Sequence, residues 1–242
     1  MKTDRVFAVF YLLLLAVHLI VGQLDMEQFA DATKPLLLLS IIVYYARTVR
    51  KYRYSPFALW ILLGLVLSWL GDIALMFVDK NDNFFTFGLG AFLFGLIFYC
   101  AAFVKSYLVN HEIQLLKKRG WVLVLVAAYG FFFFRAIKDH LGDLVGPVIA
   151  YTMVLMLMLL LALNRHKKVS DRSFVLIAVG AVLFTASDSI LAWDYFVDEL
   201  PYGHILVMLP YGLAQLLIML GALDHIRDAV ANNPNRHVLS EE

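Results

Sequence analysis

The sequence predicts an all-α membrane protein, a bundle of eight transmembrane helices that forms one integral-membrane domain over residues 1–242. Hydrophobic residues make up 62% of the chain and charged residues only 16%, whereas a soluble globular domain carries about 25% charged residues. The apolar residues come in runs close to the roughly 17–25 residues that cross a bilayer as a helix. Basic residues gather in alternate connections between these runs, which is typical of a chain that crosses a membrane repeatedly.

The helices are expected over 6–22, 34–49, 56–78, 84–104, 120–136, 143–163, 173–193 and 203–224. The first segment resembles a signal peptide because Lys2 and Arg5 precede it. However, it runs to Gly22 without an Ala-x-Ala cleavage pattern, so we interpret it as a helix. The second and fifth contain the shortest apolar runs, 35–46 and 120–134, and need interfacial residues or a thin bilayer to span.

The distribution of basic residues orients the chain. One alternate set of connections, which includes both termini, holds 16 of the 20 Lys and Arg residues. These are Lys2, Arg5, Arg47, Arg50, Lys51, Arg53, Lys105, Lys117, Lys118, Arg119, Arg165, Lys167, Lys168, Arg172, Arg227 and Arg236. The opposite set holds Lys34, Lys80, Arg135 and Lys138. Because basic loop residues stay in the cytoplasm, both termini are expected there, with the chain in a bacterial inner membrane.

Several kinds of site are not expected. Cys100 is the only cysteine, which excludes intrachain disulfides and cysteine-rich metal sites. His18 stands alone in the first helix and is interpreted as structural, so the helices supply no histidine cluster for a zinc ion. We therefore expect no metal and no other cofactor. The net charge of +1 gives no reason to expect a nucleic-acid partner, and the expected partners are membrane lipids.

Polar side chains inside the apolar segments fall at one predicted depth. Asp72 lies about six residues, or roughly 9 Å at 1.5 Å per residue, before the outer end of its helix, and Asp188 lies at a similar depth. The even-numbered helices enter from outside and bring to the same level Lys34, Tyr151, Tyr211 and Gln215. A charge at the bilayer centre costs about 3 kcal/mol or more, so such residues face an interior cavity and indicate a functional site.

A structural role is the competing interpretation. A Tyr or Gln in a membrane helix often links two helices, and Lys34 can serve as an anchor that extends to the interface. Two aspartates at matched depth are harder to explain in this way. The stretches LSWLGDIAL (67–75) and LFTASDSIL (183–191) also resemble each other, which favours a 4+4 parallel pseudo-repeat with the two aspartates facing each other. The small residues before them, Gly71 and Ser187, would permit close helix approach.

Six stretches, in this order and spacing, resemble the YhhN family of integral-membrane lysoplasmalogenases. They are KPLLLL (34–39), SWLGDIAL (68–75), FGLGAFL (87–93) followed by Tyr99, GPVIAY (146–151), GAVLFTASDSILA (180–192) and YGLAQLLI (211–218). The resemblance implies cleavage of the vinyl ether bond of a lysoplasmalogen to a fatty aldehyde and glycerophosphoethanolamine or glycerophosphocholine. The family carboxylates fall on Asp72 and Asp188 and the family lysine on Lys34. Leu96 stands where the family is expected to have a histidine.

Hydrolysis of a vinyl ether suits a pair of carboxyl groups. Protonation on carbon gives an oxocarbenium ion, water adds, and the hemiacetal collapses, so one acid donates a proton while the other carboxylate steadies the cation and activates water. Burial and mutual repulsion would keep at least one of Asp72 and Asp188 protonated near neutral pH. The expected substrate-binding residues are Lys34, Tyr151, Tyr211, Gln215 and Ser187. Aromatic residues such as Phe92 and Trp69 would surround the alkyl chain.

Two alternatives stay open. Buried acids and a parallel repeat also suit a proton-coupled transporter of lipids or small molecules, or a lipid sensor, although Gly/Pro breaks at mid-membrane are confined to the glycine-rich fourth helix. Lys34 has two possible roles: it could hold the lipid phosphate at the outer mouth of the cavity, or it could pair with one aspartate and keep it ionised.

Overall fold

The computed structural model describes residues 2–24, 26–52, 55–81, 83–106 and 119–232, with eight long α-helices in this part of the chain. The helices are α1 (Lys2–Gln23), α2 (Glu27–Val49), α3 (Pro56–Leu75), α4 (Asn83–Lys105), α6 (Gly120–Ile137), α7 (Val145–Leu163), α8 (Asp171–Phe196) and α9 (Gly203–Ala231). Short 3-10 helices span Arg50–Tyr52, Val78–Lys80, Lys138–His140 and Gly142–Leu144. All eight long helices are apolar enough and long enough to cross a membrane. The predicted all-α membrane fold is therefore confirmed.

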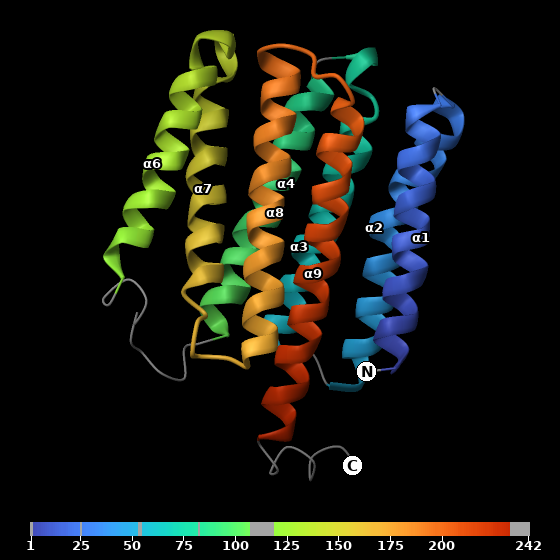
Figure 1. Ribbon diagram of the computed structural model, residues 1–242, viewed down its shortest axis with the longest axis vertical. Helices are drawn as coiled ribbons and strands as arrows, with labels where there is room; N and C mark the ends of the chain where they lie inside the picture. The colour runs from blue at the N-terminus through green and yellow to red at the C-terminus, as the bar shows by residue number, and fades with distance from the viewer. Residues whose placement is uncertain (1, 25, 53–54, 82, 107–118, 233–242) are drawn as a thin grey trace.

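The helices form one layered bundle with α3, α4, α8 and α9 at its centre (Figure 1). Helix α8 packs along α9 and α3 packs along α4, and these are the most extensive helix contacts. The α1–α2 hairpin lies on one side, where α2 contacts α3 and α9, and the α6–α7 hairpin lies on the other, where α7 contacts α4 and α8. The two halves are thus arranged similarly around the central helices, while the 4+4 repeat stays a prediction.

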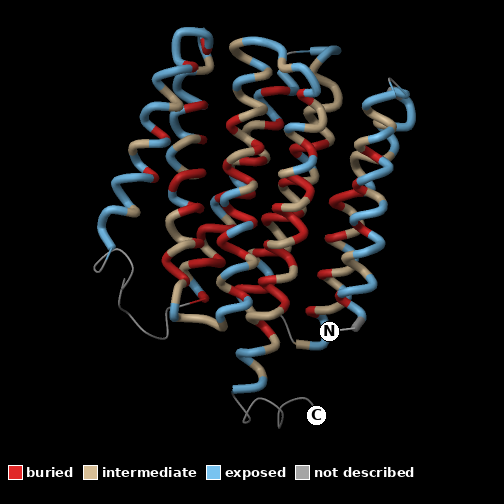
Figure 2. Tube along the Cα trace, viewed as in Figure 1, coloured by how far each residue is buried: buried red, intermediate tan, exposed pale blue. Residues whose placement is uncertain are grey.

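Burial is concentrated in the central helices, whereas the outer helices are largely exposed (Figure 2). In α6 the buried residues are Val126, Gly130 and Ile137, whereas Phe131 and Phe132 are 63% and 68% exposed. Lipid tails are as apolar as these side chains. The surface of α6 therefore suits a lipid environment rather than water.

Polar contacts fix the end of the bundle where α1 begins and α9 ends. Arg227 of α9 donates two hydrogen bonds to the Asp4 carboxylate of α1, at 2.7 and 2.8 Å, and Tyr44 of α2 donates a third at 2.7 Å. Ser55 and Ser170 cap α3 and α8 at the same end by accepting a backbone N–H. The α1–α2 hairpin is in this way tied to the central helices.

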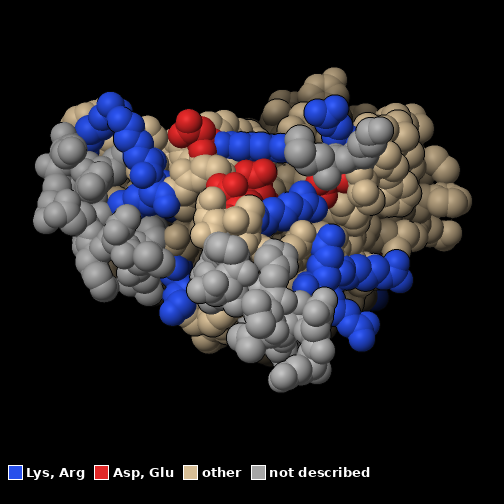
Figure 3. All heavy atoms as spheres, turned by 90° about the horizontal axis from the view of Figure 1, so that it is seen from below, with Lys and Arg blue, Asp and Glu red and all other residues tan. Residues whose placement is uncertain are grey.

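Lysine and arginine side chains spread across this end of the bundle (Figure 3). The cytoplasmic orientation of the termini, which was predicted from the basic residues, stays a prediction. Four of the basic residues used for it lie outside the described residues, namely Arg53, Lys117, Lys118 and Arg236.

Five helix ends differ from the sequence prediction by three or more residues, including the start of α1 at Lys2 rather than 6 and the end of α8 at Phe196 rather than 193. Helix α2 begins at Glu27 rather than at 34, because its first two turns are polar and a hydropathy pattern cannot reveal them. Helix α9 continues seven residues beyond 224, to Ala231, for the same reason. Helix α3 ends at Leu75 rather than at 78, where a turn and a 3-10 helix follow. These shifts move the predicted site residues relative to their helix ends.

Candidate active site

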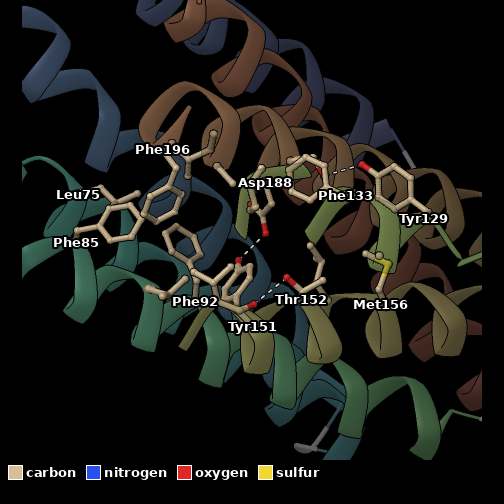
Figure 4. Close-up of a pocket in the computed structure, with 18 residues that line it drawn as sticks. Leu75, Phe85, Phe92, Tyr129, Phe133, Tyr151, Thr152, Met156, Asp188 and Phe196 are labelled. Carbon is tan, nitrogen blue, oxygen red and sulfur yellow. Dashed lines mark hydrogen bonds between the residues drawn. The ribbon is translucent and has the colours of Figure 1, made fainter. Parts of the chain in front are cut away.

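An apolar pocket lies between α4, α6, α7 and α8, with Asp188 in its wall (Figure 4). The space between its walls is about 690 Å³, including the part that opens to the outside. The lining residues are Leu75, Phe85, Leu89, Phe92, Tyr129, Gly130, Phe133, Ile137, Val148, Tyr151, Thr152, Leu155, Met156, Asp188, Ser189, Leu191, Ala192 and Phe196. We call this space the Asp188 pocket. Asp188 is the one ionisable carboxyl group in that lining, which suits a site that binds a hydrocarbon chain and acts on one bond near it.

Tyr151 holds the Asp188 side chain at the pocket wall. The Tyr151 hydroxyl of α7 donates to Asp188 Oδ2 of α8 at 2.5 Å (Figure 4). Tyr151 is buried and Asp188 is half-buried, so the carboxyl group keeps an accessible side toward the pocket. Tyr151 and Asp188, both predicted site residues, are therefore in direct contact. The second carboxyl oxygen is left to face a ligand.

Asp72 lies in a different, polar environment. The Tyr211 hydroxyl of α9 donates to Asp72 Oδ2 of α3 at 2.9 Å, and both residues are buried. Tyr11 of α1 also lies close enough to interact with the Asp72 charge, and its own hydroxyl donates to the carbonyl of Gly212 at 3.0 Å. Asp72 is thus surrounded by side chains from the α1, α3 and α9 helices rather than by the Asp188 pocket, which it does not line.

Gln215 extends this polar cluster toward α4. The Tyr99 hydroxyl donates to Gln215 Oε1 at 2.7 Å, and both residues are fully buried. The Gln215 amide nitrogen makes no hydrogen bond of good geometry within the described residues. A buried donor in this state is uncommon in a folded protein. Gln215 is therefore suited to donate to a polar group of a ligand beside Asp72.

Lys34 lies deeper than the sequence predicted. Because α2 begins at Glu27, Lys34 is seven residues into the helix, or about 10 Å along its axis. Its charge interacts with that of Asp72, although no ion pair joins the two within 4 Å among the described residues. Lys34 is half-buried, so its ammonium group is able to serve both a ligand phosphate and Asp72.

His18, alone in its helix, has a partner in space. Its Nδ1 lies 2.8 Å from Thr33 Oγ1 and its Nε2 lies 3.2 Å from His204 Nε2. Thr33 donates its own proton to the backbone of α2. His18 Nδ1 must therefore donate to Thr33, which leaves His18 Nε2 to accept from His204. The three residues link α1, α2 and α9 near Lys34, whose charge interacts with both histidines.

The two aspartates are close enough for their charges to interact, but each carboxyl group has its own tyrosine. No hydrogen bond joins the two carboxyl groups in the described chain. Asp72 is three residues from the end of α3 and Asp188 eight from the end of α8, so the helix ends do not place them at equal depth. Phe92 contacts both regions, because it lines the Asp188 pocket and its ring lies 6.0 Å from that of Tyr211.

Gly71 is needed where Phe92 sits. A Cβ atom at Gly71 would lie 2.6 Å from the Phe92 ring, so only glycine leaves room for this ring against α3. The small residue before Asp72 thus shapes the pocket wall. The corresponding Ser187 is different, because its hydroxyl donates to the carbonyl of Val207 at 2.8 Å and joins α8 to α9. Neither Ser187 nor Trp69, which donates to the Pro35 carbonyl at 3.0 Å, lines the pocket.

Sequence reasoning missed Tyr129, Ser189 and Thr152, which are pocket residues with hydroxyl groups. Tyr129 carried a usable signal, because it is the only hydroxyl-bearing residue in the apolar run 120–134. Ser189 directly follows Asp188 and was hidden among the small residues of the same stretch. Among the described residues, no group of three or more His, Cys, Asp or Glu side chains could hold a metal ion.

The sequence profile of the YhhN family matches residues 29–222. The chain belongs to the YhhN family. The matched region begins in α2 and ends in α9, so it contains all seven predicted site residues. Helix α1, which brings Tyr11 and His18 to the polar cluster, lies outside the match. Leu96, at the position where a family histidine was expected, is fully buried in the core.

Named relatives within this similarity are mammalian enzymes. The chain is 35% identical over 160 residues to lysoplasmalogenase TMEM86B of Homo sapiens, covering 66% of this chain and 62% of that protein. It is 35% identical over 166 residues to lysoplasmalogenase TMEM86B of Mus musculus, covering 68% and 64%. It is 26% identical over 170 residues to lysoplasmalogenase TMEM86A of Bos taurus, covering 70% and 67%. The chain therefore spans less than two thirds of the human and mouse relatives. No solved structure matches it significantly.

Proposed function

We propose that this YhhN family member is a lysoplasmalogenase-like hydrolase that cleaves the vinyl ether bond of a lysophospholipid. The proposal is supported by relatives named lysoplasmalogenase and by one observation above all: a tyrosine-bound carboxyl group, Asp188, in the wall of an apolar pocket. A lysoplasmalogen has a hydrocarbon chain attached directly to its reactive vinyl ether. A chain in the pocket would therefore bring the reactive carbons to Asp188.

The environments of the two aspartates support different roles. Asp188 lines the apolar pocket and can reach a bound chain, whereas Asp72 lies within reach of the Lys34 charge, which opposes the effect of its burial. Asp188 then donates its proton to the vinyl carbon that is not bonded to oxygen. The charge of the Asp72 carboxylate, which interacts with that of Asp188, steadies the resulting oxocarbenium ion.

The remaining steps return the proton. Water adds to the cationic carbon and gives its proton to the Asp188 carboxylate, which now faces that carbon as a base. The hemiacetal collapses to a fatty aldehyde, and the glycerol oxygen leaves with a proton as an alcohol. The other products would be glycerophosphoethanolamine or glycerophosphocholine. Lys34 would hold the phosphate, and Tyr211 and Gln215 would orient the glycerol or the water. No cofactor is part of this mechanism.

Aldehyde release tests the proposal directly. Purified protein in detergent is given a lysoplasmalogen, and the aldehyde and the glycerophosphodiester are measured by mass spectrometry. We expect both products in equal amounts, and neither with the Asp188→Asn variant. A folded protein that binds the lipid but releases no aldehyde would instead support the transporter or sensor interpretation.

The proposal includes the location of the chain in a membrane, which the eight apolar helices support. We place both termini in the cytoplasm, in a bacterial inner membrane, from the distribution of basic residues. A reporter fused after Glu242, which lies outside the described residues, should read as cytoplasmic. An external reading would reverse the orientation and the side from which Lys34 is reached.

A further inference from the structure

A second apolar cavity lies directly below the Asp188 pocket, toward the end of the bundle where α6 begins. It is a groove open to the surface of the bundle, with about 600 Å³ between its walls, and is lined by Leu125, Val126, Tyr129, Leu159, Val182, Thr185 and Ala186. In each of α6, α7 and α8, the residues that line this space lie nearer to that end of the bundle than the residues that line the Asp188 pocket. Tyr129 lines both spaces. Tyr129 therefore lies where the two spaces meet.

The hydroxyl group of Tyr129 is fixed across the helix gap. Tyr129 of α6 and Ser189 of α8 lie with their hydroxyl oxygens 2.7 Å apart. Ser189 donates its proton to the carbonyl of Thr185 at 2.8 Å, so the Tyr129 hydroxyl must be the donor in the pair. This bond joins α6 to α8 beside Asp188 (Figure 4). It holds the Tyr129 ring across the base of the pocket.

The backbone beside Tyr129 is also held closely. A Cβ atom at Gly130 would lie 2.7 Å from Met156 Cγ, so α6 packs closely on this side chain of α7. The Tyr129 side chain is thus held at its hydroxyl by α8, and its backbone lies where α6 packs on α7. The residue is 43% exposed, so part of its side chain is not covered by protein.

We propose that Tyr129 sets the length of alkyl chain that the protein accepts, a role that rests on the proposed function. With the vinyl ether at Asp188, the chain fills the pocket down to the Tyr129 ring. A longer chain has to displace the ring and enter the second cavity. Both spaces are lined almost wholly by apolar side chains, and the hydroxyls of Tyr129 and Ser189 are already bonded to each other. The continuation therefore suits further methylene groups of the same chain.

The test uses saturated alkyl-ether lysophosphatidylcholines of increasing chain length, which bind without being cleaved. Dissociation constants are measured for the wild type and for Tyr129→Ala. At each chain length the lipid partitions into detergent to the same extent with both proteins, so this contribution cancels in the ratio of the two constants. We expect wild-type affinity to level off at a limiting length. Beyond that length Tyr129→Ala should gain about fourfold in affinity for each added methylene, the factor expected for burying one CH₂ group.

Two variants serve as controls. Tyr129→Phe keeps the ring but loses its hydrogen bond to Ser189, and should move the limiting length less than Tyr129→Ala. Phe133→Ala, one turn away and in the lining of the Asp188 pocket alone, should weaken binding at every length without moving the limit. If Tyr129→Ala does not fold, Tyr129→Leu makes the same opening with more packing retained and should move the limit by a smaller amount.

The length profile and the hydrolysis are independent results. Parallel profiles for the wild type and Tyr129→Ala would overturn the chain-length role even if the wild type releases aldehyde. A wild type that binds no member of the series would overturn it as well. A shifted profile in a protein that releases no aldehyde would support the chain-length role and overturn the hydrolase proposal.

Discussion

The Asp72 and Asp188 regions are built alike at one contact and differ in everything around it. Each carboxyl group accepts a phenolic hydroxyl at Oδ2, from Tyr211 at 2.9 Å and from Tyr151 at 2.5 Å. Asp72 is buried in a polar cluster to which α1, α3 and α9 contribute, whereas Asp188 is half-buried beside an apolar pocket between α4, α6, α7 and α8. One residue type is thus placed in two electrostatic environments within a single bundle.

The difference indicates why a membrane enzyme would keep two aspartates rather than one. A carboxyl group among apolar side chains tends to stay neutral and can donate a proton, whereas one near a cation tends to stay ionised. Equivalent aspartates that share one proton would need adjacent carboxyl groups, and no hydrogen bond joins the two among the described residues. The environments favour a division of labour, with Asp188 as the donor and Asp72 as the fixed charge.

Asp188→Asn should have the largest effect, because an amide cannot donate the proton. We expect kcat for aldehyde release to fall by about 10³-fold, within the range that a general acid contributes. The measurement is single-turnover aldehyde release, with the melting temperature as a control for folding. Activity within a factor of about three of the wild type would show that Asp188 is not the donor.

Asp72→Asn should have a smaller but still large effect, because it removes a charge and keeps the shape. We expect kcat to fall by about 10²-fold, comparable to the loss of one electrostatic contact to a developing charge. The same assay measures it. The activities of Asp72→Asn and Asp188→Asn are compared over a range of pH. If Asp72→Asn is as inactive as Asp188→Asn at every pH, the proposed division of roles between the two regions is wrong.

Lys34→Met should weaken lipid binding more than catalysis. If the ammonium holds the phosphate, the dissociation constant of an uncleaved alkyl-ether lysophospholipid should rise about tenfold, the scale of a charged hydrogen bond. A double-mutant cycle with Asp72→Asn should show coupling, and one with Asp188→Asn should show nearly none. A collapse of kcat with unchanged binding would instead mean that Lys34 acts only by keeping Asp72 ionised.

Tyr151→Phe and Tyr211→Phe should have the smallest effects and should differ from each other. Each removes one hydroxyl donor worth about 1 kcal/mol, or roughly fivefold. We expect Tyr151→Phe to lower kcat by about this factor, because Tyr151 orients the proton donor. Tyr211→Phe should lower it less, because Lys34 remains near Asp72. Steady-state kinetics of the two variants measure the ratio, and the reverse order would contradict the assignment of the donor.

Much of the fold was predictable because lipid imposes simple rules on sequence. Eight apolar runs gave eight helices, and the largest differences lie at helix ends where polar turns continue the helix, as at Glu27 and Ala231. Hydropathy measures transfer into lipid and does not detect a polar turn that projects from the membrane. The predicted position of Lys34 was affected most, because the helix begins seven residues before it and Lys34 therefore lies deeper in the bundle than expected.

The polar residues of the site were predictable, but their grouping was not. A carboxyl group in an apolar helix is conspicuous, so Asp72 and Asp188 could be found from sequence alone. Their tyrosine partners come from α9 and α7, and only helix packing decides which tyrosine meets which aspartate. Ser187 shows the limit, because a residue beside Asp188 proved to bond the Val207 carbonyl of α9 instead.

The central claim is that one fixed group, Asp188, protonates the vinyl carbon, and hydrolysis in D₂O tests it most directly. The aldehyde is reduced at once to the alcohol so that its α-hydrogens cannot exchange, and the position and configuration of deuterium are read by mass spectrometry and NMR. The account predicts a single deuterium at the carbon next to the former carbonyl, on one face only. Deuterium absent from that carbon, or spread equally over both faces, would contradict it.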